Sequence, residues 1–499
     1  MNLPLLLEMA ADSAPDRIVV GSRIGGLTAS ELFVRAQRVA TAFAAKDVAH
    51  VGFLDLNSDA VPIALFGAAL AGIPFAPVNY RLADDTLHSI LERLVPGIVV
   101  VGRSAVERAR GIDGLEVITT DELLALASDD SAAIWDELPF VDPDDVAVLL
   151  FTSGTTGEPK AAVLRHRHLT SYVITTLEFM SADEADAQLV SVPSYHIAGV
   201  SAILSSLYSG RRIVYLPAFD AEDWVRVVRD EHITQAMVVP TMLGRVLSVV
   251  EADGGGLPSL RHLSYGGGRM PVELIERAMN VLPDVSFVNA YGLTETSSTI
   301  AVLTPDDHRE AIASDDPAVR GRLGSVGRPL PTVELEIRGA DGEPLETGER
   351  GEIHVRGEQV AGEYLGRSLL TEDGWFPTND AGHLDEQGFL YLDGRLDDVI
   401  VRGAENLSPG EIEDALLSNP GVAEAAVVGV PDAEWGEAVA AAVVLEPGAA
   451  VTEDELKDWV RERLRSTKTP ALIDFRTELP YNETGKLLRR VLRDELRQR

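Results

Sequence analysis

A loop rich in glycine and hydroxyl residues is the segment of this sequence best suited to hold an anion. It runs Thr152-Ser153-Gly154-Thr155-Thr156-Gly157 and comes directly after the apolar run 146–151. Lys160 follows, and the pattern of the residues after it predicts a helix. Glycines let successive backbone N–H groups turn toward an anion, hydroxyls add donors, and the lysine adds a full positive charge. No Gly-Lys-Ser/Thr sequence follows the glycines, so this is not a Walker A loop. The alternative is a small-residue surface turn that happens to contain a lysine.

The elements on either side of this loop predict an α/β fold. Apolar runs at 51–56, 97–102, 146–154 and 187–193 read as buried strands, and the stretches 61–72 and 83–94 between them have helical spacing. Alternation of this kind predicts parallel sheets covered by helices, and it continues to about residue 292.

The pattern of predicted strands and helices changes twice in the second half of the chain. From about residue 322, strand-like runs are separated by Gly, Pro and Asp turns with little helix, which indicates a small β-rich subdomain. After residues 394–398 a new unit of helices and strands begins and continues to the end of the sequence. We therefore predict an N-terminal domain over 1–394, with its β-rich subdomain at about 322–394, and a C-terminal α+β domain over 395–499.

Composition excludes several classes of function. The formal charge of −36 argues against nucleic-acid binding, because phosphates require a basic surface. The chain has 0 cysteines, which removes disulfides, thiolate metal sites and cysteine nucleophiles and fits a cytoplasmic enzyme. No segment approaches the roughly 18 apolar residues of a membrane span. The first residues read as an amphipathic helix rather than a signal peptide.

Six segments of the chain read as motifs: LLFTSGTTGEPKAAVLRHRHL (149–169), PSYHIAG (193–199), YGLTETSS (291–298), GWFPTNDAG (374–382), GRLDDVIVRGAENLSPGEIE (394–413) and NETGKLLRR (482–490). In this order they resemble the motifs of the adenylate-forming superfamily, which includes acyl- and aryl-CoA synthetases, firefly luciferases and peptide-synthetase adenylation domains. Their residues look most similar to those of bacterial fatty-acid–CoA ligases.

The resemblance implies a two-step reaction that needs ATP, Mg²⁺ and coenzyme A. An organic acid and ATP would give an acyl-AMP and pyrophosphate, and coenzyme A would then take the acyl group and release AMP. The fold implied is α/β, with a large N-terminal domain of two helix-covered sheets plus a small β-barrel-like subdomain, and a small mobile C-terminal α+β domain.

The same resemblance assigns the charged residues of the first step. Lys486 would bridge the carboxylate and the α-phosphate, and Thr294 and Glu295 would meet the phosphates and the metal, with Thr155 as a second metal contact. These groups place positive charge where anionic charge accumulates in the transition state. The residues expected to bind the nucleotide are Thr152, Ser153, Gly154, Thr155, Thr156, Lys160, Gly267, Ala290, Tyr291, Gly292, Asp380 and Arg395.

Within that nucleotide set, three residues have specific expected roles. Tyr291 would stack on adenine. Asp380 would accept both ribose hydroxyls, since a carboxylate offers two acceptor oxygens. Arg395 would contact the ribose or a phosphate.

Acid binding and the second step involve other positions. His196, Gly266 and Gly268 are expected at the acyl pocket, where His196 has either a catalytic task or only a place in the wall. Asp397 is expected at the hinge about which the C-terminal domain swings after adenylation. Arg402 and Gly403 would then face the coenzyme A arm.

The sequence also departs from the family pattern. Ala161 and Asn379 stand where glycine is usual, and the pocket segment reads YGGGRMP (265–271). The segment TKTPALIDF (467–475) lacks a tyrosine that commonly precedes its lysine. None of these changes removes a charged catalytic group, so they bear on the substrate rather than on the reaction type.

Three interpretations of function remain open at this point. The first is a CoA ligase for a medium- or long-chain fatty, alicyclic or aromatic acid. The second is an acyl-AMP ligase or adenylation enzyme that loads a carrier protein in trans. The third is a catalytically silent adenylate-binding protein. A homodimer is expected, and neither nucleic acid nor a membrane span is.

Overall fold

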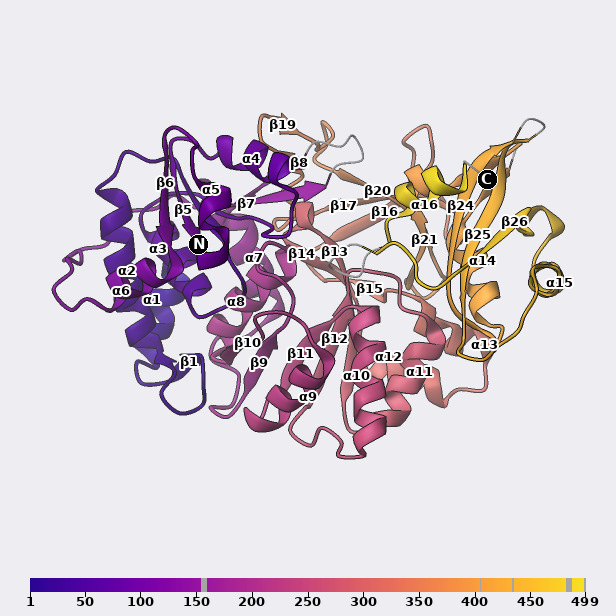
Figure 1. Ribbon diagram of the computed structural model, residues 1–499, viewed down its shortest axis with the longest axis horizontal. Coiled ribbons are helices and arrows are strands. Elements are labelled where there is room, and N and C mark those ends of the chain that lie inside the picture. Colours follow the sequence, from indigo (N-terminus) through magenta and orange to yellow (C-terminus); the bar gives the residue numbers. More distant parts are fainter. Residues whose placement is uncertain (154–158, 404, 433–434, 482–486, 498–499) are drawn as a thin grey trace.

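The computed structural model describes residues 1–153, 159–403, 405–432, 435–481 and 487–497. These residues form two large sheets, a four-stranded sheet and a C-terminal five-stranded sheet, all accompanied by helices (Figure 1). In Figure 1 the N-terminal helices lie at one end of the molecule and the C-terminal sheet at the other. The predicted α/β class is confirmed.

The sheet that carries the predicted anion loop has the strand order β19-β18-β8-β7-β4-β3-β5-β6. Its centre is parallel, whereas β7 and β8 pair antiparallel. The strands predicted at 51–56, 97–102 and 146–154 are β3, β5 and β7. The strand bounds are β3 (His50–Leu54), β4 (Phe75–Pro77), β5 (Gly97–Val101), β6 (Leu115–Thr119), β7 (Val146–Ser153), β8 (Pro159–Arg165), β18 (Glu363–Tyr364) and β19 (Arg367–Ser368).

The second large sheet has the order β15-β14-β13-β12-β11-β9-β10-β1-β2. It is parallel from β1 to β13 and becomes antiparallel at β14 and β15. Its bounds are β1 (Ile18–Val20), β2 (Leu27–Thr28), β9 (Ala187–Val190), β10 (Arg212–Tyr215), β11 (Gln235–Val238), β12 (His262–Gly266), β13 (Ser286–Leu293), β14 (Ser298–Leu303) and β15 (Arg328–Pro329).

Helices pack on both large sheets. One buried cluster joins the two sheets, and a separate cluster lies under the other helices of each sheet. The helix of residues 60–70 is apolar on every side and all of its residues are buried, as expected for a helix enclosed by other elements. The helices up to residue 324 are α1 (Leu3–Ser13), α2 (Ala29–Ala44), α3 (Ala60–Leu70), α4 (Asp84–Glu92), η1 (Arg103–Ala105), α5 (Val106–Ala109), α6 (Thr120–Ser128), α7 (His166–Thr176), α8 (Ile197–Ser209), α9 (Ala221–Asp230), α10 (Pro240–Asp253), α11 (Val272–Val281), η2 (Thr294–Thr296), α12 (Pro305–Ala313), α13 (Pro317–Arg320) and η3 (Gly321–Gly324).

The β-rich stretch forms an antiparallel sheet in the order β16-β17-β20-β21. Its bounds are β16 (Glu334–Arg338), β17 (Gly351–Arg356), β20 (Phe376–Leu384) and β21 (Leu390–Arg395). The chain leaves this sheet after β17, adds β18 and β19 to the eight-stranded sheet, and returns as β20. One segment therefore joins two sheets.

The C-terminal residues form a fourth sheet, ordered β23-β22-β25-β24, with β26 parallel to β25. Its elements are η4 (Leu396–Asp398), β22 (Ile400–Arg402), β23 (Glu405–Leu407), α14 (Pro409–Leu417), β24 (Val422–Asp432), β25 (Gly436–Leu445), α15 (Glu453–Arg463), η5 (Ser466–Lys468), β26 (Leu472–Arg476) and α16 (Arg489–Leu496). Among the helices of the described ranges, none is both long and apolar enough to cross a bilayer.

Two histidines at the start of α7 are almost completely buried. His166 and His168 are 1% and 2% exposed, and burial lowers the pKa of each from 6.5 to about 4. His166 Nδ1 accepts a hydrogen bond from the Leu3 N–H at 3.2 Å, which ties α1 to α7. Both rings are therefore neutral in the folded protein near neutral pH.

These histidines should make stability depend on pH. Between pH 6.5 and 4 the unfolded chain binds their protons and the folded chain does not, so stability falls as pH falls. The shift predicts a loss of about 2 kcal/mol per histidine between pH 7 and 5. Urea unfolding at both pH values measures it. His166→Asn, which keeps an acceptor near Nδ1, should reduce the difference, whereas replacing the exposed His232 should leave it unchanged. An equal pH dependence in His166→Asn and the unchanged protein would contradict this account.

Candidate active site

The predicted anion loop connects two antiparallel strands. Thr152 pairs with Lys160 across β7 and β8, and Ser153 pairs with Pro159. The sequence predicted a helix directly after the lysine, and this is wrong: Lys160 lies within β8, and α7 begins only at His166. The run 161–164 is apolar and buried against β7, so it continues the sheet instead. Gly154, Thr155, Thr156 and the Ser153 side chain lie outside the described residues.

An arginine that the sequence analysis did not select supports both strand ends. Arg93, at the end of α4, donates from Nη1 to the Pro159 carbonyl at 2.6 Å. Its guanidinium lies over the Phe151 ring, 5.2 Å from the centroid. The two chain segments that enter and leave the loop are therefore held by one side chain.

Lys160 and Glu295 lie on either side of a tyrosine. Lys160 Nζ is 5.7 Å from the centroid of the Tyr364 ring, and the Tyr364 hydroxyl donates a hydrogen bond to Glu295 Oε1. Burial and the nearby Glu295 carboxylate raise the pKa of Tyr364 well above its ordinary value, so the hydroxyl stays protonated. Glu295 itself is only 9% exposed. Thr294 and Glu295 form η2 at the end of β13.

A second cluster forms around Asp380. Tyr291 donates from its hydroxyl to Asp380 Oδ2 at 2.7 Å, and Arg395 Nε lies 3.0 Å from Asp380 Oδ1. Arg395 also donates to the Thr378 carbonyl at 2.9 Å. Burial, followed by the Asp380 charge, raises the pKa of Tyr291. The structure thus brings together three predicted residues from β13, β20 and β21.

The predicted glycines have distinct structural roles. A Cβ on Gly266 would lie 2.4 Å from the carbonyl oxygen of Ala290, its partner on β13, and one on Gly292 would lie 1.9 Å from the Ser298 oxygen. Gly267 has φ +74°, whereas a Cβ on Gly268 would make only ordinary contacts. Gly266 is therefore required by strand packing, whereas Gly267, Gly268 and Gly292 are exposed.

Comparison with known proteins decides the family. Residues 7–365 match the AMP-binding enzyme family, and residues 411–486 match the AMP-binding enzyme C-terminal domain. The chain belongs to the AMP-binding enzymes.

Relatives that match over nearly the full length include acid–CoA ligases. A 2-succinylbenzoate–CoA ligase of Bacillus licheniformis is 34% identical over 99% of this chain and 100% of its own length. A feruloyl-CoA synthase of Amycolatopsis sp is 34% identical over 94% of both chains. This AMP-binding enzyme is accordingly an acid–thiol ligase that acts through an acyl-adenylate.

Solved structures support the same conclusion. The o-succinylbenzoate CoA synthetase (MenE) of Bacillus subtilis, in complex with the acyl-adenylate intermediate OSB-AMP, has 31% identity and a TM-score of 0.85 over 98% of each chain. The same enzyme has also been solved with ATP and a magnesium ion, with a TM-score of 0.83, 31% identity, and coverage of 97% of this chain and 98% of that one. The AMP-binding enzyme described here uses ATP and Mg²⁺.

His196 lies in an aromatic group of this AMP-binding enzyme. It precedes α8, and its ring centroid is 4.6 Å from that of Tyr195. Tyr195 in turn meets Tyr80 edge to face at 5.7 Å. The imidazole is therefore placed by ring packing at the beginning of a helix.

Asn379 has a structural explanation that the sequence did not provide. Its φ is +59°, a left-handed value that asparagine tolerates better than most residues. Its N–H donates to Glu352 Oε1 at 2.9 Å, and its side-chain amide donates to Asp397 Oδ2, also at 2.9 Å. The residue before Asp380 thus touches the predicted hinge aspartate.

The predicted coenzyme A residues lie on the C-terminal sheet beside a tryptophan. Arg402 donates from Nη1 to the Thr467 carbonyl at 2.5 Å, and its guanidinium lies 5.7 Å from the centroid of the Trp435 ring. Gly403 has φ +63° and donates its N–H to the Trp435 carbonyl at 2.7 Å. Lys486, the predicted catalytic lysine, lies outside the described residues.

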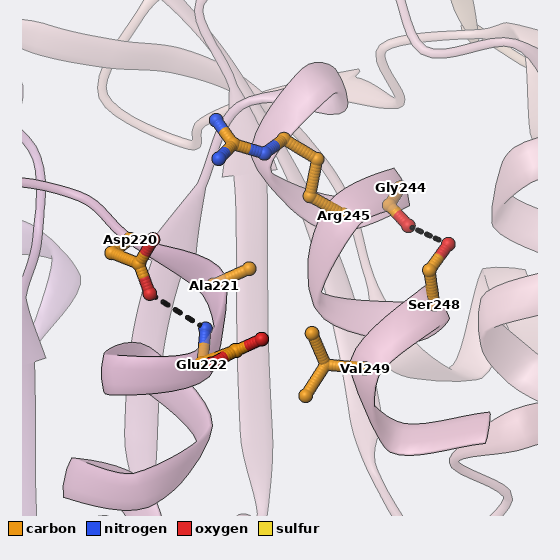
Figure 2. A pocket seen from close by; sticks show the side chains of 7 residues that line it. All are labelled: Asp220, Ala221, Glu222, Gly244, Arg245, Ser248 and Val249. Atoms are coloured by element: carbon orange, nitrogen blue, oxygen red, sulfur yellow. Dashed lines mark hydrogen bonds between the residues drawn. The ribbon is translucent and has the colours of Figure 1, made fainter. Parts of the chain in front are cut away.

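A surface groove of about 390 Å³ between α9 and α10 contains none of the predicted site residues (Figure 2). Two of its polar side chains make hydrogen bonds with the backbone of their own helices. Asp220 accepts from the Glu222 N–H at 2.9 Å, and Ser248 donates to the Gly244 carbonyl at 3.0 Å. The lining residues are Asp220, Ala221, Glu222, Gly244, Arg245, Ser248 and Val249.

The left-handed backbone at Asn379 gives a direct test of the local structure. Asn379→Gly should change the free energy of unfolding by less than about 1 kcal/mol, because glycine adopts this φ freely. Asn379→Val should lower it by roughly 1–3 kcal/mol, since a β-branched residue is strained there. Urea unfolding of both variants measures the difference. Equal stabilities would show that position 379 does not need a left-handed residue.

Proposed function

We propose that the residues around Glu295 and Asp380 form the site at which this ligase activates its acid. The observation that supports this most directly is that Tyr291, Asp380 and Arg395, far apart in the sequence, are joined by hydrogen bonds and an ion pair. In the first step a carboxylate oxygen attacks the α-phosphorus of ATP, and the bond to the β-phosphate breaks to release pyrophosphate. In the second step the coenzyme A sulfur attacks the acyl carbon, AMP leaves with the electrons of the broken C–O bond, and the thiol proton is lost.

The Asp380 group suits the ribose end of the nucleotide. Each carboxylate oxygen can accept more than one hydrogen bond, so Asp380 can receive ribose hydroxyls while Tyr291 and Arg395 hold its orientation. Arg395 is 37% exposed in its side chain, which leaves part of its guanidinium open to a ribose or phosphate oxygen. Gly267, Ala290 and Gly292 belong to the adjoining strand ends and are proposed nucleotide contacts.

The Glu295 group suits the phosphate end. Within the described part of the chain, the Glu295 carboxylate accepts a hydrogen bond only from Tyr364, so its second oxygen is available to a hard cation. Bound Mg²⁺ would supply charge that neutralises phosphate oxygens. Lys160 adds a further positive charge, and Thr152, Ser153 and the loop 154–158 with Thr155 and Thr156 are the proposed donors beside it.

The second half of the cycle is proposed to use the C-terminal residues. The domain over 395–499 would pivot at Asp397, withdraw Lys486 and present Arg402 and Gly403 to the adenylate. The contact between Asn379 and Asp397 supports a coupling between the nucleotide site and this pivot. We also propose a cytoplasmic location and a homodimer.

The substrate is proposed to be an aromatic carboxylic acid, with a fatty acid as the alternative. The three relatives with 34% identity carry names with an aromatic acid, succinylbenzoate or ferulate. His196, with its neighbouring tyrosine rings, and the exposed Gly268 are the proposed pocket residues; flat rings pack well against other aromatic groups.

Product analysis tests the function directly. The enzyme is incubated with ATP, Mg²⁺, coenzyme A and a panel of aromatic, fatty and amino acids, and products are identified by mass spectrometry. We expect one acyl-CoA together with AMP. An acyl-AMP without thioester would assign the enzyme to carrier-protein loading, and absence of both products with every acid would contradict the proposal.

Lys486→Ala separates the two steps. The variant should lose adenylate formation by at least a hundredfold, because one charge that stabilises the transition state is removed. Thioester formation from supplied acyl-AMP should remain largely intact. Pyrophosphate exchange and single-turnover thioester formation measure the two steps, with Lys46→Ala, at an exposed lysine, as the control. Equal loss of both steps would overturn the assigned role.

A further inference from the structure

Tyr364 is the only residue described here that touches both charged groups of the proposed phosphate end. Its hydroxyl donates to the Glu295 carboxylate, and its ring lies under the Lys160 ammonium at 5.7 Å from the centroid. The sequence motifs did not include it, because Tyr364 falls between the segments 291–298 and 374–382. Its position in the structure, rather than its sequence context, identifies it.

The backbone next to Tyr364 is tied to the element that carries Glu295. The N–H groups of Ala361 and Gly362 both donate to the Glu295 carbonyl oxygen, at 2.9 and 3.0 Å. The main chain of Glu295 is therefore fixed by the same segment whose side chain holds its carboxylate. Any movement of this segment would move both ends of the glutamate.

The same segment is tied to the strand that carries Lys160. The Leu365 N–H donates to the Ala161 carbonyl at 2.9 Å. Glu363 accepts three hydrogen bonds from Arg165 of β8, between 2.8 and 3.1 Å, in a bidentate ion pair. Bidentate arginine–carboxylate pairs impose a defined geometry. Tyr364 is thus held rigidly to the strand on one side and to η2 on the other.

The chemistry of the side chain fits a positioning task. A protonated phenol can only donate to the carboxylate, and one donated bond fixes the rotation of the carboxylate while its second oxygen remains open to a cation. An ammonium group above an aromatic ring is attracted to the ring face, which limits where the lysine can point.

We propose that Tyr364 is a positioning residue that orients Glu295 toward a divalent cation and Lys160 toward phosphate oxygens. This inference rests on the proposed function of the Glu295 site. The hydroxyl acts on the metal ligand and the ring acts on the lysine, so the two effects can be separated by substitution. Tyr364→Phe removes only the hydroxyl, and Tyr364→Leu removes both.

The first measurement is pyrophosphate exchange as a function of free Mg²⁺ at constant ATP. Tyr364→Phe should raise the half-maximal Mg²⁺ concentration roughly tenfold, as expected for losing one hydrogen bond to a charged group, with little change in the KM for the acid. Tyr364→Leu should in addition raise the KM for ATP. Tyr391→Phe is the matched control, since Tyr391 is also half-buried but stacks on His383 at 5.1 Å, and it should leave both values unchanged.

A double substitution shows whether the hydroxyl acts through Glu295. In the Glu295→Gln background, Tyr364→Phe should have little further effect on the Mg²⁺ dependence, because coupled residues are not additive. An unchanged Mg²⁺ dependence in Tyr364→Phe alone, or full additivity in the double variant, would overturn the inference.

Direct binding separates this inference from the proposed function. Titration of Mn²⁺ into the enzyme with ATP measures metal affinity without turnover. It therefore tests the role of Tyr364 even if no acid supports pyrophosphate exchange. Weaker Mn²⁺ binding by Tyr364→Phe than by the unchanged enzyme supports the inference. Equal binding overturns it.

Discussion

The backbone hydrogen bonds of residues 361–365 are the constraint on which the site depends. This segment leaves the four-stranded sheet after β17, pairs with β8 of the eight-stranded sheet at Tyr364 and Ala162, and bonds to the Glu295 carbonyl beyond β13 of the nine-stranded sheet. Three sheets therefore meet at one short piece of chain. Lys160 and Asp380 belong to different sheets and Glu295 to η2, so this junction contributes to the spacing of all three, together with the Tyr291–Asp380 hydrogen bond.

The residues at this junction also bear on how a strongly acidic chain could bind an anionic nucleotide. A chain with a net charge of −36 repels anionic substrates, although salt screens this repulsion beyond about 8–10 Å. Cations must then be supplied where phosphates would lie. Among the described residues, Lys160 lies against an aromatic ring and pairs with no carboxylate, while Arg395 is held by Asp380 and the Thr378 carbonyl. At the proposed site, the local placement of cations rather than the overall charge would attract a nucleotide.

Sequence patterns predicted the buried strands better than the segments that connect one sheet to another. The apolar runs at 51–56 and 97–102 specify buried parallel strands, because their residues are buried on both faces of the sheet. Lys160 was placed before a helix because the residues after it were read as a helical pattern, yet the apolar run 161–164 pairs with β7. Tyr364 was missed because its strand has only two residues and gains its position from contacts with two distant segments. Asn379 was noted as a departure, but only the φ of +59° shows why asparagine suits it.

The contacts between the C-terminal residues and the rest of the molecule are consistent with a unit that moves. Arg269 pairs with Asp414, Ser408 donates to the Asp393 carbonyl, and Asn379 donates to Asp397. Both side chains of the Arg269–Asp414 pair are about half exposed, and exposed pairs of this kind contribute roughly 0–1 kcal/mol. By contrast, the C-terminal sheet has its own buried clusters, so its internal packing does not depend on these contacts. A domain can change its position without unfolding only if its contacts with the rest of the molecule are weak and its own core keeps it folded. The C-terminal unit meets both conditions.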